Sequence, residues 1–227
     1  MPSQTIGSAP ALSPPRAAAI AGVLFSVLMG TSLVIVRLAI PTYRMDPGAW
    51  TQDPSRLAAV RFAVQLAPFA GIAFLWFVGV LRNQIGALED QFFATVFLGS
   101  GLLFVASLFA SAAFSGALID AVASHHLQPL NSETYYFARQ IIGSFLNVFA
   151  IKMAGVFIVS TSTIVLRTRI LPRWVPFSGY PCALVLLLVI TNWPWIALLF
   201  PAWMLVLSMR ILLAQFHPVM RPAAAVS

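Results

Sequence analysis

The sequence predicts an all-α fold, a polytopic transmembrane helical bundle of about six spans. Of the 227 residues, 60% are hydrophobic and only 8% are charged, whereas a soluble domain carries about 25% charged residues. The mean hydropathy is +0.91. Several apolar blocks approach or exceed the roughly 20 residues that a helix needs to cross a bilayer. The lipid bilayer is therefore the expected surroundings, and the predicted spans are about 17–40, 58–81, 92–119, 137–166, 178–193 and 195–213.

The first span follows residues 1–16, which are rich in serine, proline and alanine and are expected to form a disordered cytoplasmic tail. The apolar run 17–40 is longer than the hydrophobic region of a signal peptide, and no clear cleavage site follows it. We therefore expect an uncleaved first helix. The transmembrane domain covers 17–213, and a second cytoplasmic tail, 214–227, follows it.

The second span is expected to begin near Pro54, because Asp53 supplies an N-cap and a proline suits the first helical position. Pro68 in the second span and Pro201 in the sixth fall inside apolar helix. A proline there removes a backbone hydrogen bond, which predicts a kink in each helix.

Small residues recur every four positions in the first and third spans. This pattern favours close helix packing, within the bundle, with a second copy or with a partner membrane protein. The residues are Gly22, Ser26, Gly30, Ser107, Ser111 and Ser115. The last two spans are joined by the short stretch NWPW, residues 192–195, so a single broken helix or a re-entrant pair is the alternative for this region.

The arginines predict that both termini lie in the cytoplasm, because short cytoplasmic loops carry an excess of Lys and Arg. The inner side would hold Arg16, Arg82, Arg167, Arg169, Arg173, Arg210 and Arg221, and the outer loops only Arg44 and Arg56. Arg37, Arg61 and Arg139 lie at the outer ends of spans, where long side chains reach the headgroups.

Three stretches carry a resemblance to known proteins: LAPFAGIAFLWFVGVLR (66–82), EDQFFATVFLGSGLLFVA (89–106) and STSTIVLRTRILPRW (160–174). Over most of residues 54–190 the chain resembles a family of bacterial, actinobacterial multi-span membrane proteins without an assigned activity. The resemblance implies a bacterial plasma membrane and supplies no catalytic residue.

Lys152, the only lysine, lies near the middle of the fourth span. A charge at that depth is costly and suggests function. No span carries a central carboxylate, so the expected partners are neutral groups, namely Gln65, Asn147 or helix carbonyls near Pro68, or an anionic ligand. A purely structural lysine is the alternative.

The outer loop 119–137 holds four side chains able to bind a metal: Asp120, His125, His126 and Glu133. Adjacent histidines point in different directions, and no helical pair of ligands is present. A solvated loop is therefore favoured over a metal site.

The sequence excludes several functions. The arginines are scattered, which argues against nucleic acid binding, and no histidine within a span could hold heme. No P-loop, zinc motif or paired nucleophile and base occurs, so no cofactor is expected. Three hypotheses remain: a non-enzymatic protein that packs with itself or a partner, a small permease or anion- and lipid-binding protein, and an outward-facing enzyme that uses His125 and His126.

Overall fold

The computed structural model describes residues 14–40, 49–85, 91–124, 132–168, 171–188 and 195–216, and within them every regular element is a helix. The elements are α1 (Pro14–Ala39), η1 (Ala49–Gln52), α2 (Pro54–Ile85), α3 (Gln91–Ser124), α4 (Ser132–Gly143), η2 (Ser144–Ala150), α5 (Ile151–Thr168), α6 (Trp174–Leu188), η3 (Ile196–Leu198) and α7 (Leu199–Phe216). The predicted all-α bundle is confirmed. The predicted tails lie largely outside the described residues.

Among the described residues, five helical segments are long and apolar enough to cross a membrane, so the chain is a multi-pass membrane protein. They are Arg16–Ala39, Pro54–Arg82, Phe92–Ala123, Glu133–Thr168 and Ile196–Ala214. The fourth segment joins α4, η2 and α5 into one continuous rod. Residues 178–188 of the predicted span 178–193 lie in α6, which has 15 residues, and the remainder of that span lies outside the described residues. At 1.5 Å per residue α6 is about 22 Å long, less than the roughly 30 Å of a bilayer core.

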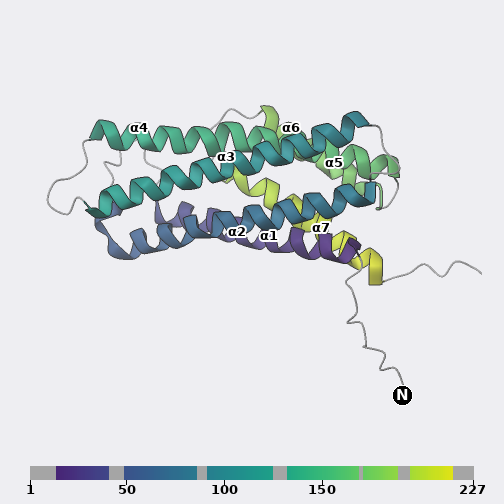
Figure 1. Cartoon of the computed structure of the whole chain (residues 1–227), viewed down its shortest axis with the longest axis horizontal. Coiled ribbons are helices and arrows are strands. Elements are labelled where there is room, and N and C mark those ends of the chain that lie inside the picture. Colours follow the sequence, from purple (N-terminus) through teal and green to yellow (C-terminus); the bar gives the residue numbers. More distant parts are fainter. Residues whose placement is uncertain are drawn as a thin grey trace, which may run out of the picture.

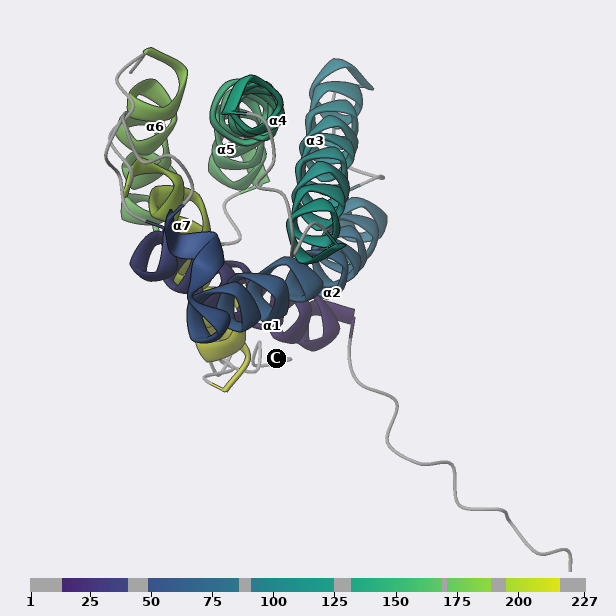
Figure 2. The same cartoon turned by 90° about the vertical axis from the view of Figure 1, so that its left-hand side faces the viewer.

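The long helices run in alternating directions along the bundle, and α6 and α7 cover only one half of it (Figure 1). Seen from the end, α3, α4, α5 and α6 form one layer above α1, α2 and α7 (Figure 2). Helix α1 packs on α2 and α7, and α5 packs on α3 and α6. The start of α1 and the end of α7 lie at the same end of the bundle, as the predicted topology requires (Figure 1).

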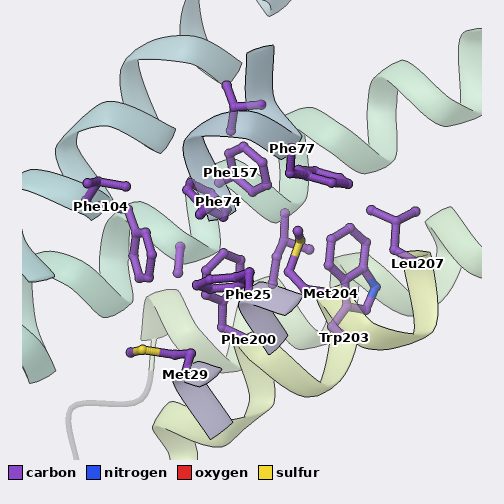
Figure 3. Close-up of a cluster of buried hydrophobic side chains, with 14 of the residues drawn as sticks. Phe25, Met29, Phe74, Phe77, Phe104, Phe157, Phe200, Trp203, Met204 and Leu207 are labelled. Carbon is purple, nitrogen blue, oxygen red and sulfur yellow. The ribbon is translucent and has the colours of Figure 1, made fainter. Parts of the chain in front are cut away.

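The core of the covered half is an aromatic cluster with one phenylalanine from each of five helices: Phe25, Phe74, Phe104, Phe157 and Phe200 (Figure 3). The ring centroids of Phe25 and Phe74 are 4.9 Å apart, and those of Phe104 and Phe200 are 4.8 Å apart. Tilted and edge-on contacts of this kind stabilise aromatic pairs beyond their buried area. The cluster fixes α1, α2, α3, α5 and α7 at one level.

The other half has a smaller core, in which the end of α1, η1 and the adjoining ends of α2, α3 and α4 meet. Its largest members are Trp50 and Tyr135, which are both buried, and Trp50 Nε1 donates a hydrogen bond of 2.7 Å to the Tyr135 hydroxyl. This contact fixes η1 against α4.

The predicted start of α2 is confirmed. Asp53 Oδ1 accepts hydrogen bonds from the backbone N–H groups of Ser55, at 2.9 Å, and Arg56, at 3.4 Å. The prediction for Pro201 needs correction: Pro201 is the third residue of α7 and so lies in the first turn, where a missing N–H is tolerated. Pro68 lies inside α2 as predicted.

Two glycines of the predicted small-residue stripe of α1, Gly22 and Gly30, have different surroundings. A side chain at Gly22 would collide with the Ser208 hydroxyl of α7, so this glycine permits a close contact between α1 and α7. Nothing lies within 4 Å of the position where Gly30 would carry a side chain. Gly22 therefore serves the packing inside the molecule.

Candidate functional site

Lys152 lies where α6 ends. Its Nζ donates hydrogen bonds to the carbonyl oxygens of Leu186, at 3.0 Å, and Leu187, at 2.5 Å. The last carbonyls of a helix lack partners in their own helix, and a cation is favourable beside the negative end of the helix dipole. The expected neutral partners are therefore present, but they belong to α6 and not to the neighbourhood of Pro68.

The position of Lys152 also shows how deep α6 reaches. Lys152 is residue 20 of the 36 in Glu133–Thr168, counting from Glu133. Since α6 ends beside Lys152, α6 ends about halfway along the rod formed by α4, η2 and α5.

Of the predicted set of Lys152, Gln65 and Asn147, only Asn147 lines the cavity described below, and the set as one site stays a prediction. Gln65 is exposed on α2, and Lys152 contacts α6. Asn147 instead lines a cavity in the half of the bundle that α6 and α7 leave uncovered.

This cavity, which we call the arginine cavity, holds about 180 Å³ and is lined by α1, η1, α2, α3, α4 and η2. One water molecule needs only about 15 Å³ measured in this way, so the space admits a small ligand or the polar part of a larger one. Much of the wall is apolar and includes Leu33, Val36, Val64, Leu118, Ile142 and Leu146.

Two guanidinium groups define the chemistry of the arginine cavity. Arg37 comes from α1 and Arg139 from α4, and the two charges are close enough to repel each other. Among the described residues that line the cavity there is no aspartate or glutamate. Within the described part of the chain, Arg37 makes no hydrogen bond or ion pair. The described lining of the cavity therefore carries two formal positive charges and no formal negative charge.

Tyr135 connects the charged wall to η1. Its hydroxyl oxygen accepts hydrogen bonds from Trp50 Nε1, at 2.7 Å, and from Arg139 Nη1, at 3.4 Å. Because the oxygen accepts from both neighbours, the hydroxyl proton remains available for an acceptor in the cavity. Arg37, Arg139 and Tyr135 thus present donors to the same space.

The wider turns of η2, a π-helix, position Asn147. The Ile151 N–H bonds to the carbonyl of Leu146, five residues earlier, which is the π-helical pattern. The carbonyl of Ile142 accepts a bond of 3.2 Å from the Ser111 hydroxyl of α3. Irregular π turns inside α-helices often occur at functional sites. Here the π turn lies at the inner end of the arginine cavity.

The predicted metal ligands are dispersed in the described structure. Asp120 Oδ1 lies 3.4 Å from Arg61 Nη2, and Glu133 is exposed in the first turn of α4. His125 and His126 lie outside the described residues. Among the residues that the structure describes, no three side chains of His, Cys, Asp or Glu lie close enough to hold a metal ion. The metal site stays a prediction.

Sequence reasoning treated Arg37 and Arg139 as two separate side chains that reach the headgroups. The signal for a joint site was weak, because 101 positions separate them and only the folded bundle brings them together. Their position inside apolar helices, without a carboxylate one turn away, was the available clue.

No family model, curated protein or solved structure matches this chain.

Proposed function

We propose that this chain is a non-enzymatic, multi-pass protein of the bacterial plasma membrane that binds an oxyanion in the arginine cavity. The observation that carries the proposal is the pair of guanidinium groups of Arg37 and Arg139 on one cavity without a carboxylate in its described lining. Among the hypotheses from the sequence, this is the permease or anion- and lipid-binding protein, with the site moved from Lys152 to the arginines.

Electrostatics supports an anionic ligand. Removing a charge from water is costly, and two like charges in one low-dielectric space add their repulsion to that cost. A bound oxyanion offsets both effects. A guanidinium also presents a planar fork of donors that matches the oxygens of a phosphate, sulfate or carboxylate group.

The other two hypotheses have less support. The packing hypothesis relied on the small-residue stripes, and Gly22 is already used by Ser208 of the same chain. The enzyme hypothesis needs an acid and a base in the loop 119–137, where Asp120 is in an ion pair with Arg61.

The test is thermal unfolding of the detergent-solubilised protein in millimolar sulfate and in chloride of equal ionic strength. A ligand that binds only the folded state raises the melting temperature. We expect sulfate to stabilise the wild type, and Arg37→Gln to abolish that effect while raising the melting temperature in chloride, since one repelling charge is removed.

Arg61→Gln is the matched control, because Arg61 is also near a helix end but is paired with Asp120 and does not line the arginine cavity. It should keep the full response to sulfate. Equal responses in the wild type and Arg37→Gln would show that sulfate acts on the protein surface in general, and the proposal would then be wrong.

A further inference from the structure

Building on the proposed anion site, we infer that the oxyanion is the phosphate of an amphiphile, a membrane lipid whose headgroup lies between Arg37 and Arg139 and whose hydrocarbon lies along the apolar wall. The inference concerns the class of ligand. It depends on the depth of the charges, on the polarity of the wall and on the helices that line the cavity.

The depth of the two arginines matches that of lipid phosphates. Arg37 lies 9.5 residues from the midpoint of Arg16–Ala39, and Arg139 lies 11.5 residues from the midpoint of Glu133–Thr168. At 1.5 Å per residue these offsets are about 14 Å and about 17 Å along the helices. Half of a bilayer core is about 15 Å, so both side chains start at the boundary between hydrocarbon and headgroups.

Beyond the two charges the wall becomes apolar toward the middle of the bundle. Leu33 lies one turn from Arg37 along α1, and Leu146 lies two turns from Arg139 along the rod. The Ser115 hydroxyl donates to the backbone oxygen of Ser111 at 2.7 Å and is therefore occupied. A free inorganic ion would leave this apolar space unused, whereas a hydrocarbon chain would fill it.

Asn147 adds one neutral polar group at the end of the arginine cavity that lies nearer the middle of the bundle. It is eight residues from Arg139, about 12 Å along the rod. Its carboxamide can donate to an ester or hydroxyl oxygen in the linker between a phosphate and its hydrocarbon chain.

The lining helices place the cavity where lipid reaches the bundle. Among the described residues, none of α5, α6 or α7 lines it. Helices α6 and α7 lie beside the other half (Figure 1). The half of the bundle that holds the arginine cavity is therefore not covered by α6 or α7.

The first experiment compares two probes, hexyl phosphate and inorganic phosphate, on the full-length protein in amphipol, by isothermal calorimetry. Each buried methylene strengthens binding about fourfold. We expect hexyl phosphate to bind at least about tenfold more tightly than inorganic phosphate, since two buried methylenes suffice. Arg37→Gln should weaken both probes. Val64→Phe, which fills the apolar wall, should weaken hexyl phosphate only, and Arg61→Gln should change neither.

The results separate this inference from the proposed function. Equal affinity for the two probes would overturn the lipid inference and leave the anion site standing. No binding of either probe to wild-type protein from which bound lipid has been removed would overturn both. If hexyl phosphate binds Arg37→Gln as tightly as wild type, the binding is general partitioning and the inference fails.

A second measurement does not depend on a folded variant. Mass spectrometry of lipids that remain with the wild-type protein through purification should find a phospholipid at about one per chain. A neutral lipid as the retained species, or no retained lipid after gentle extraction, would contradict the inference.

Discussion

At the scale of single residues, Lys152 and Arg37 are two cations in apolar helices with different surroundings. Lys152 meets the carbonyl oxygens of Leu186 and Leu187, while Arg37 faces a second guanidinium, that of Arg139. The first arrangement is favourable in the folded protein without a ligand, and the second is the one on which we base the proposed anion site. Burial of a charge in a membrane helix is therefore a poor guide to function unless its partners are known.

Lys152→Met should destabilise the protein, because the carbonyl oxygens of Leu186 and Leu187 would lose a charged donor. Removing such a partner costs about 1–2 kcal/mol. The measurement is thermal unfolding in detergent, with Lys152→Gln as the control that keeps a donor. A melting temperature equal to that of wild type would show that these hydrogen bonds contribute nothing.

Asp53 makes α2 sensitive to acid. The Ser55 hydroxyl, at 2.6 Å, and the backbone N–H groups of Ser55 and Arg56 hold the pKa of Asp53 below its ordinary value. The carboxylate therefore stabilises the fold above the unfolded pKa of about 3.9, and this stabilisation is lost as the pH falls through the lower pKa of the folded state.

Asp53→Asn keeps a capping oxygen but cannot titrate, so it isolates the effect of charge. We expect wild type to be more stable than the variant at pH 6, and the difference to shrink as the pH falls below about 4. Unfolding curves at several pH values would measure it. A difference that is constant with pH would contradict the assignment.

At the scale of the elements, the glycines of α1 distinguish packing inside the molecule from an open surface. Gly22→Ala should lower the melting temperature, because its new methyl group would collide with the Ser208 hydroxyl and separate α1 from α7. Gly30→Ala is the matched control in the same helix and faces open space. It should be neutral or stabilising by up to about 1 kcal/mol, since alanine is the better helix former.

The helices themselves could largely be predicted from the sequence, because apolar blocks and capping residues are local signals. Asp53 and Pro54 predicted the start of α2 correctly. The π-helix η2 could not be predicted in this way, since its wider turn accompanies a contact between Ile142 and Ser111 of another helix. The start of α6 at Trp174 was also missed, because Pro176 and Pro181 interrupt the apolar run from which a span beginning at 178 was predicted.

At the scale of the whole molecule, the site could be predicted only in part. Asn147 was among the predicted binding residues and does line the arginine cavity, whereas Lys152 and Gln65 do not. The cavity depends on Arg37 and Arg139 meeting across the bundle, and no local pattern in one sequence reports such a contact. The aromatic cluster likewise takes single phenylalanines from five distant helices.

The short helix α6 has a consequence for the surrounding membrane. Trp174, Phe177 and Leu184 expose apolar side chains along it, yet α6 is only about 22 Å long. The rod beside it, α4 to α5, is more than twice as long. A hydrophobic surface shorter than the bilayer core makes the adjacent lipids thin to match it. The protein would thus deform one side of its own annulus of lipids, and it would fit a thin membrane at a lower energetic cost than a thick one.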